Sequence, residues 1–325
     1  MCLGNTMRNT SISIIIGISI VLCIGVIHLP ENDLIAAPLS FDFIVDASDA
    51  GTRARGGAGI GVSENILMTP INPASIGWLK SPEIAINYGT GIAGMKITRA
   101  AIGIPTKSIM AACTFSMWNM PSEPETDYNG ITGFAMQYSV MAVDLTVMRW
   151  AQRIPVGVTA HFIRETLPEG FSIFTTFDAG VQDMYIINEF GIIESIFWGA
   201  ALRHIGPNVR RGLRREQPPM SIGGGGGITI NVNGVVCMLP MIDIEYRLHN
   251  KTIIRPGLQC DINEWLSLRI GRRIDRSTME VISCGLGIHR LIKKRSVQFD
   301  YAVSFLRDDL EARHTIQLSC DISRR

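Results

Sequence analysis

The sequence has few charged residues and no strong charge of either sign. Only 18% of its 325 residues are charged, the formal net charge is +1, and 46% are hydrophobic. Because so small a net charge creates no field that attracts nucleic acid, we expect no nucleic-acid partner. The mean hydropathy is +0.22, yet no long apolar run follows residue 27. That combination is unusual for a soluble domain.

The sequence also lacks the motifs of enzymes, cofactor sites and metal sites. The glycines near residue 57 do not complete G-x-G-x-x-G, because its third position is Val62. Neither H-E-x-x-H nor a nucleophile elbow occurs. C-x-x-C is absent, and an odd number of cysteines follows the N-terminal segment: Cys113, Cys237, Cys260, Cys284 and Cys320. We therefore expect no enzyme activity, no cofactor and no metal site, with the cysteines acting as small hydrophobic residues.

The N-terminal region resembles an export signal. The apolar run "SISIIIGISIVLCIGVI" covers residues 11–27, Arg8 precedes it, and the small residues of "IAAP" follow it. We expect an export signal peptide over 1–37, with cleavage near Ala37 and the outer membrane as the destination. The alternative is an uncleaved membrane anchor, since the run is almost long enough to span a bilayer.

From residue 84 onward, apolar and polar residues alternate with a period of two. In "SVQFDYAVSF", Phe299 and Val303 belong to an apolar face, whereas Gln298 and Asp300 belong to a polar one. This pattern predicts strands with two different faces. About 14 such segments occur, a number typical of membrane barrels. They cover residues 84–89, 94–104, 109–118, 134–149, 153–164, 174–187, 193–204, 219–231, 235–248, 253–262, 265–273, 280–290, 296–306 and 312–322.

The connections between these segments alternate between short and long. Those at 106–107, 151–152, 231–234, 263–264 and 292–294 are short, whereas "NMPSEPETDYNGITG" and "IGPNVRRGLRREQP" are long and polar. This asymmetry is typical of outer-membrane barrels. We predict an all-β fold in which residues 83–325 form a transmembrane antiparallel β-barrel of about 14 strands in contact with outer-membrane lipid.

Four shorter features of the sequence give further local predictions. "GMKITRAAIGIP" changes phase near Arg99, which predicts a β-bulge. "RRGLRR" predicts a solvated loop. Trp118, Trp150 and Trp265 lie near strand ends, where a barrel carries its aromatic girdles. The glycine run "SIGGGGG" predicts a bend in the wall or room for something packed inside.

Charged residues within the strands are expected to face the barrel lumen. A basic residue facing lipid near the midplane costs about 2–4 kcal/mol, and an acidic one somewhat less. His161 and His289 lie on polar faces of separate strands, and we interpret both as hydrogen-bonded lumen histidines. The predicted lumen-facing polar residues are Asp144, His161, Asp243, Arg269 and Asp300.

Before the first strand lies "GTRARGGAGIGVSENILMTPINPASIGWLK", residues 51–80. We predict that residues 38–82 form a small plug inside the barrel. Gly56 and Gly57 would let its backbone approach the wall, and Asn72 would cap a turn fixed by Pro73 before Ala74. A segment that closes a pore has to move, so we expect modest contacts between plug and wall.

"AGTRARGGAGIGVSENILMTPINPASIGWL" resembles the N-terminal signature of the PorV/PorQ group of outer-membrane proteins, relatives of FadL-type fatty-acid transporters. "WGAALRHIGPNV" and "LRIGRR" resemble two later motifs of that group. The resemblance departs at Ser63, Glu64 and Asn65, and the C-terminal "DISRR" has no terminal aromatic residue. It implies a plugged barrel that is a channel or transporter for hydrophobic small molecules. The alternatives are a PorV-like carrier or docking component for proteins of type IX secretion, and a purely structural barrel.

Overall fold

The computed structural model describes residues 49–322, except 107, 128–129, 137, 169, 188–191, 212–213, 233, 249–250, 276–279, 293–294 and 308–309. The predicted export signal lies outside the described residues. Within the described ranges, no helix has both the length and the apolar character needed to cross a membrane.

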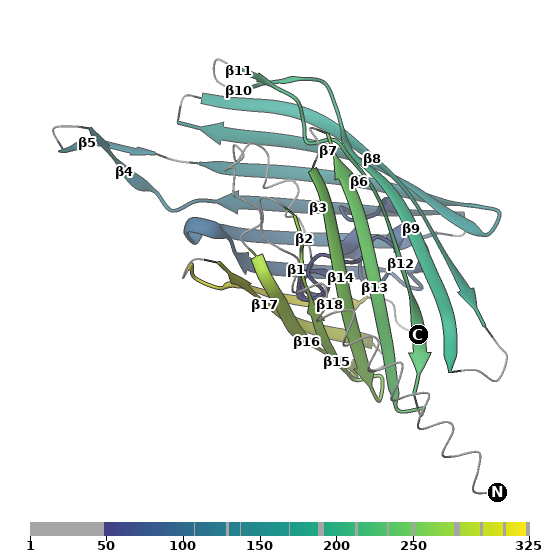
Figure 1. The fold of residues 1–325 in the computed structure, drawn as a ribbon. Coiled ribbons are helices and arrows are strands. Elements are labelled where there is room, and N and C mark those ends of the chain that lie inside the picture. Colours follow the sequence, from purple (N-terminus) through teal and green to yellow (C-terminus); the bar gives the residue numbers. More distant parts are fainter. Residues whose placement is uncertain are drawn as a thin grey trace, which may run out of the picture.

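The strands close into one antiparallel barrel of 14 strands, as the sequence predicted (Figure 1). Each strand pairs with its neighbour, and β1 pairs with β18 to close the ring. Around the barrel the strands are β1 (Glu83–Thr90), β2 (Lys96–Pro105), β3 (Ile109–Asn119), β6 (Ser139–Ala151), β7 (Ile154–Leu167), β8 (Gly170–Ile186), β9 (Ile193–Ile205), β12 (Ser221–Asn231), β13 (Val236–Arg247), β14 (Lys251–Ile262), β15 (Leu266–Gly271), β16 (Glu280–Ile292), β17 (Arg295–Leu306) and β18 (Arg313–Asp321).

Two hairpins lie outside the ring. β4 (Glu123–Asp127) pairs with β5 (Gly130–Met136), and this hairpin projects beyond the neighbouring strands (Figure 1). β10 (Val209–Arg211) pairs with β11 (Arg214–Glu216). The prediction of one strand over 134–149 is therefore wrong at its start, because residues up to Met136 belong to the projecting hairpin. Part of "RRGLRR", predicted to be a solvated loop, belongs to this second hairpin: Arg210 and Arg215 are exposed, whereas Arg211 pairs with Glu165 and Glu216.

The five connections predicted to be short all lie at the same end of the barrel, here called the short-turn end. They join β2 to β3, β6 to β7, β12 to β13, β14 to β15 and β16 to β17. At the opposite end, the long-loop end, the two hairpins and residues 206–220, 272–279 and 307–312 connect the strands. The connections between β7 and β8 and between β13 and β14, at this same end, are short. The 3₁₀ turn η3 (Ile92–Gly94) joins β1 to β2.

Alternation along the strands separates an exposed outer face from a buried inner face. In β17, Phe299 is 41% exposed, whereas the neighbouring Asp300 is 0% exposed. β18 repeats this, with Ile316 and Leu318 exposed and Thr315 and Gln317 buried. The inner face is therefore the polar one, which reverses the arrangement of a soluble protein.

Two local predictions are wrong. Pairing of β2 with β1 and β3 is continuous past Arg99, so this strand contains no bulge there. Trp118 is 3% exposed and packs among apolar residues inside the barrel, while Trp150 packs edge-on against Trp78 of the plug. Trp118 and Trp150 therefore do not form part of an outer girdle, because apolar residues at the strand ends pack inward here.

Three short helices precede the barrel and lie within its ring of strands, as the purple segment of Figure 1 shows. They are α3 (Ala50–Ala54), η1 (Ile66–Met68) and η2 (Pro73–Trp78). Each has an Asp or Asn at its N-cap whose side chain accepts a backbone N–H: Asp49, Asn65 and Asn72. Caps of this kind let short helices form where backbone groups would otherwise lack partners. We call the segment from Asp49 to Pro82 the plug.

Candidate functional site: the plugged barrel interior

The plug contacts the wall through glycines of the wall's inner face. A Cβ atom at Gly180 would lie 2.0 Å from Asn72 Oδ1, and one at Gly199 would lie 2.3 Å from Ile60 O. At Gly271 it would lie 2.1 Å from the backbone of Arg55. Gly157 lies in the same way against the backbone of Pro73. Wall glycines thus make space for the plug backbone, at distances that no other residue type permits.

The glycine run of β12 has a similar role. A Cβ at Gly223 would lie 2.9 Å from Ile60 Cδ1, and one at Gly225 would lie 1.8 Å from Asp243 Oδ1. The prediction that this run leaves room for something packed inside is therefore confirmed. The space is occupied by Ile60 of the plug and by the carboxylate that binds the plug backbone.

Gly56 and Gly57 take positive φ angles of 68° and 88° just after α3. A Cβ at Gly56 would lie 2.3 Å from the backbone nitrogen of Arg272, and one at Gly57 would lie 2.8 Å from the Arg255 side chain. Both glycines therefore satisfy a conformational and a steric requirement at the same point. They let the chain turn tightly where it meets the wall.

Asn72, Pro73 and Ala74 begin η2. The Asn72 side-chain Oδ1 accepts the Ala74 N–H at 3.0 Å, and Pro73 occupies the first helical position. The Asn72 amide also donates to Ile60 O at 2.9 Å and to Val181 O at 3.0 Å. One side chain therefore caps the helix, links two parts of the plug and attaches the plug to β8.

Buried charges connect the start of the plug to β14–β17. Arg55 Nη1 lies 2.6 Å from Glu64 Oε1 and donates to Gln259 Oε1 at 2.6 Å. Arg269 Nη1 lies 2.6 Å from Asp300 Oδ1, and Arg269 Nη2 lies 3.7 Å from Glu64 Oε2. Burial alone would raise the pKa of the Glu64 carboxyl, but Arg55 and Arg269 hold it at about 2. Glu64 therefore stays ionised and links the plug to the wall.

A second group of charges lies on β9, β13 and β14. Asp243 Oδ2 accepts the Gly59 and Ile60 N–H groups at 2.7 and 2.9 Å. Next to it, Glu245 forms ion pairs with three arginines that are each less than one-tenth exposed: Arg203, Arg247 and Arg255. The Glu245 ion pairs lie within the wall, whereas Asp243 attaches the plug backbone to β13. That the plug is less stable than the wall stays a prediction.

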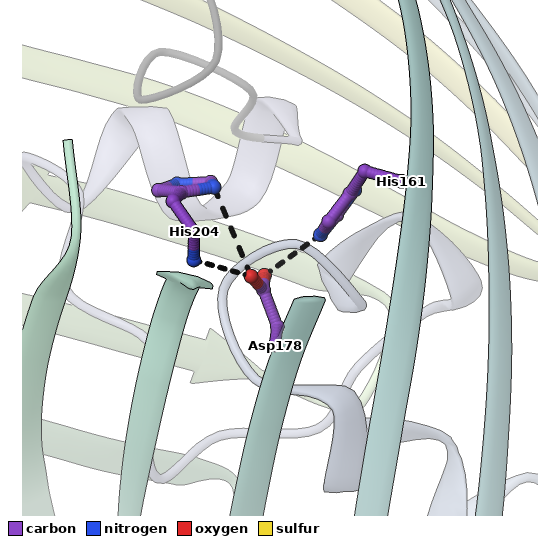
Figure 2. Close-up of side chains that lie close together, drawn as sticks. All are labelled: His161, Asp178 and His204. Carbon is purple, nitrogen blue, oxygen red and sulfur yellow. Dashed lines mark hydrogen bonds and ion pairs between the residues drawn. The ribbon is translucent and has the colours of Figure 1, made fainter. Parts of the chain in front are cut away.

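Three further buried side chains converge from β7, β8 and β9 (Figure 2). His161 Nε2 lies 2.9 Å from Asp178 Oδ2, and His204 Nδ1 lies 3.7 Å from Asp178 Oδ1. On its other side, His161 Nδ1 lies 2.7 Å from Asp144 Oδ1. These residues are 5% exposed or less. Nε2 of His289, like Nε2 of His161, has no hydrogen-bond partner among the described residues.

Apolar residues gather inside the barrel at both ends. At the long-loop end the first apolar cluster comprises Ile97, Trp118, Val140, Ala142, Ile163, Phe174 and Val209. A cavity of about 460 Å³ adjoins it, with Phe174 and Val209 in its lining. At the short-turn end a cavity of about 680 Å³ lies between the plug and the wall. Val62, Phe197 and Leu239 line it and belong to the second apolar cluster, with Ala58, Met68 and Met241.

The residues chosen from the sequence fall into three different groups. Asp243 binds the plug backbone, Arg269 and Asp300 pair with each other, and Asp144 and His161 belong to the histidine cluster. All five are buried on the inner face. Sequence reasoning missed several of their partners: Arg55, Glu64, Asp178, Arg203, His204, Glu245 and Arg255. Asp178 lay in phase with the polar face of its strand and could have been found, whereas His204 breaks the alternation of its strand.

No protein-family model matches this sequence, and no curated protein matches it either. The resemblance to the PorV/PorQ group thus has no support from sequence comparison.

Solved structures do share the fold. The toluene transporter TbuX of Ralstonia pickettii superposes with a TM-score of 0.55 at 11% identity, over 86% of this chain and 98% of that one. The toluene transporter TodX of P. putida gives 0.54 at 10%, over 86% and 100%. A FadL homologue of Pseudomonas aeruginosa gives 0.50 at 8%, over 84% and 97%. At such low identity the similarity shows a common barrel architecture.

Proposed function

We propose that the protein is an outer-membrane channel for small hydrophobic molecules. The outer face of the barrel supports a membrane location, because large apolar side chains are exposed on strand after strand: Ile86 is 52% exposed, Val158 55%, Ile222 58% and Ile244 52%. Soluble monomers rarely expose apolar patches larger than a few hundred Å². Such a surface is stable in contact with lipid acyl chains, with the charged residues kept inside.

The observation that carries the proposed cargo is the pair of apolar clusters at opposite ends of a polar interior. The first apolar cluster lies at the long-loop end, beside the cavity of about 460 Å³. The second borders the cavity of about 680 Å³ at the short-turn end. Ligand pockets for small apolar molecules have similar volumes and apolar linings. We infer that a hydrophobic molecule enters at the first cluster and leaves through the second cavity.

The same two apolar clusters, together with the solved structures that share this fold, support a chemical class for the proposed cargo. TbuX and TodX are described as toluene transporters. Both apolar clusters of this chain contain an aromatic side chain, Phe174 or Phe197. Aromatic rings favour edge-to-face or offset contacts with one another. A small aromatic hydrocarbon is therefore the first cargo to test.

The test is uptake of a labelled aromatic hydrocarbon by intact cells that express the full chain, compared with cells that carry an empty vector. Faster uptake supports the proposal, and equal uptake contradicts it. The informative variant is Val209→Asp, because Val209 is 4% exposed within the first apolar cluster and lies on the small hairpin outside the ring. A charge there should return uptake toward the empty-vector level. The matched control is Leu310→Asp at the same end, where Leu310 is 43% exposed.

A hydrophobic molecule can pass from one cavity to the other only if the plug moves away from the wall. In the structure Ala58 of the plug faces Gly257 of β14, and a Cβ at Gly257 would lie 3.1 Å from Ala58 Cβ. Cysteines at these positions approach the spacing of about 3.5–4.5 Å that a disulfide needs. With the native cysteines replaced by serine, oxidation of Ala58→Cys/Gly257→Cys should reduce uptake, and a reductant should restore it. Unchanged uptake after complete cross-linking would show that the plug stays in place during passage.

The alternative in which the protein resembles PorV and docks secreted proteins is favoured by one feature, the β4–β5 hairpin that projects beyond the barrel (Figure 1). Removing residues 121–137 should leave hydrocarbon uptake unchanged if the proposed channel is correct. If uptake is absent in the intact chain, and secretion of other proteins depends on this hairpin, the docking function replaces the channel. A barrel with neither property would be structural.

A further inference from the structure

His161, Asp178 and His204 form a cluster whose side chains point toward one another from three adjacent strands (Figure 2). One ligand atom from each residue lies within 4.8 Å of the others. The three residues are 4%, 1% and 3% exposed. Two imidazoles and a carboxylate are ligands that zinc and related divalent metals bind in proteins.

The atoms that face the centre of this cluster lack hydrogen-bond partners. They are His161 Nε2, Asp178 Oδ2 and His204 Nδ1; none of them forms a hydrogen bond within the described residues, and their contacts are the ion pairs of the two histidines with Asp178. Without a metal, the 2.9 Å approach of Nε2 to Oδ2 is an ion pair of a protonated His161 with Asp178, which is the arrangement that competes with a metal site. Buried polar atoms are almost always paired, so three orphaned acceptors aimed at one point require an explanation.

The outer contacts of the cluster leave those same atoms free for a metal. Asp144 Oδ1 lies 2.7 Å from His161 Nδ1, and this carboxylate favours the neutral tautomer protonated at Nδ1, in which the lone pair is on Nε2. Asp178 Oδ1 accepts the backbone N–H of His204 at 2.6 Å, so Oδ2 remains available. A carboxylate behind a histidine is the usual support of a metal-binding imidazole.

The backbone is distorted where the cluster forms. Register between β8 and β9 shifts between Phe177 and Ala179, so Asp178 lies at a β-bulge. His204 has a φ angle of 57°, which is rare for a residue other than glycine. As a result Arg203 and His204 are both buried, although they are adjacent in one strand. Conformations of this kind persist where the surrounding structure uses them, and bulges often redirect a side chain into a site.

We propose that His161, Asp178 and His204 bind one divalent transition-metal ion of the zinc type, with Asp144 as the positioning residue for His161. Ligand atoms about 2.0–2.2 Å from a tetrahedral zinc lie roughly 3.4 Å from one another. His161 Nε2 and Asp178 Oδ2 lie 2.9 Å apart, and one ligand atom from each of the three residues lies within 4.8 Å of the others. The ion would join β7, β8 and β9 at the bulge, and a water would complete its coordination. This site is independent of the proposed hydrocarbon channel.

The direct test uses the untagged full-length chain, folded in detergent and stripped of metal. After dialysis against Zn²⁺ at neutral pH, elemental analysis should find one tightly bound ion per chain. X-ray absorption at the zinc edge should show nitrogen and oxygen ligands at about 2.0–2.2 Å without sulfur. This measurement needs no variant. No stoichiometric binding would overturn the proposal in favour of a His161 imidazolium between two carboxylates, and a sulfur shell would place the ion on cysteines instead.

Variants assign the ligands. His204→Ala should abolish stoichiometric binding, whereas His314→Ala should leave it unchanged, because His314 is exposed on β18 and contacts Tyr301. Asp144→Asn should weaken binding by about 10–100-fold without abolishing it. Heat-modifiable migration on gels identifies the variants that have folded. Binding by a folded His204→Ala variant equal to that of the original chain would overturn the proposal.

Discussion

The inner and outer faces of the barrel are built from the same strands, yet they follow opposite rules. On the outer face apolar residues such as Phe299 are exposed, and on the inner face charged residues such as Asp300 are completely buried. Charges are tolerated inside because each contacts an opposite charge or a plug backbone group, as Asp300 contacts Arg269. The comparison teaches that the interior of this barrel is a packed polar core, and that its apolar surface lies outside.

The largest difference between the faces should appear when a buried charge is removed. Arg269 pairs with Asp300 and lies near Glu64, so Arg269→Leu leaves the buried Asp300 without its cation and leaves Glu64 with Arg55 alone. We expect a loss of about 3–5 kcal/mol in the free energy of unfolding. Denaturant titration in lipid vesicles measures it. The control is Arg295→Leu, since Arg295 is exposed at the start of β17, and its change should stay within about 0.5 kcal/mol. Equal losses for the two variants would refute the packed polar core.

A charge placed on the outer face gives the next largest effect. Phe299 lies near the middle of β17 and is 41% exposed. Phe299→Arg should cost about 2–4 kcal/mol in a bilayer, because the guanidinium then faces acyl chains near the midplane. Leu291→Arg is the depth control, since Leu291 lies at the short-turn end and is 80% exposed. It should cost about 0–1 kcal/mol. If both variants unfold at the same urea concentration, lipid does not surround this surface.

Glycines on the inner and outer faces differ in the space that is available for a side chain. At Gly199 on the inner face, a Cβ would lie 2.3 Å from Ile60 O, whereas at Gly224 on the outer face its nearest neighbour would be 3.6 Å away. Gly199→Ala should therefore destabilise the barrel by about 1–3 kcal/mol through overpacking against the plug. Gly224→Ala should be close to neutral. Melting of the two variants in the same detergent checks this, and a neutral Gly199→Ala would show that the plug lies elsewhere.

The smallest effect expected is the loss of a cap within the plug. Asn72→Ala removes the acceptor for the Ala74 N–H and the donor for Ile60 O. A cap contributes about 0.5–2 kcal/mol. Hydrogen exchange of the residue 74–78 amides should accelerate in this variant while exchange in β17 stays constant. Acceleration throughout the barrel would mean that plug and wall unfold as one unit.

The sequence predicted the wall better than the interior. Alternation locates strands such as 296–306 because each strand reports its own two faces. It says nothing about which inner residues meet across the barrel. From alternation alone, Asp300→Arg should be tolerated in a water-filled lumen. In the structure it would place two guanidinium groups together, because Arg269 lies 2.6 Å from Asp300.

The histidine cluster was unpredictable for a related reason. His161, Asp178 and His204 are far apart in sequence, and strand register alone brings them together. His204 turns inward because of the β-bulge between β8 and β9. At this bulge Asp178 alone lies opposite two residues of β9, Arg203 and His204. Trp118 was wrongly predicted to lie in an outer aromatic girdle. Alternation shows which residues of a strand share a face, but it does not show which face points into the barrel. The strand end at Trp118 is apolar on the inside as well, within the first apolar cluster.

The most direct test of the reversed faces uses two native tryptophans. Trp198 is 37% exposed on the outer face of β9, and Trp118 is 3% exposed inside the barrel. Two variants, each keeping one of these and carrying phenylalanine at the other four tryptophan positions, are folded into vesicles with brominated acyl chains, which quench on contact. The fluorescence of Trp198 should be strongly quenched and that of Trp118 almost unaffected. Equal quenching of the two, or none of Trp198, would contradict a membrane barrel with a packed polar interior.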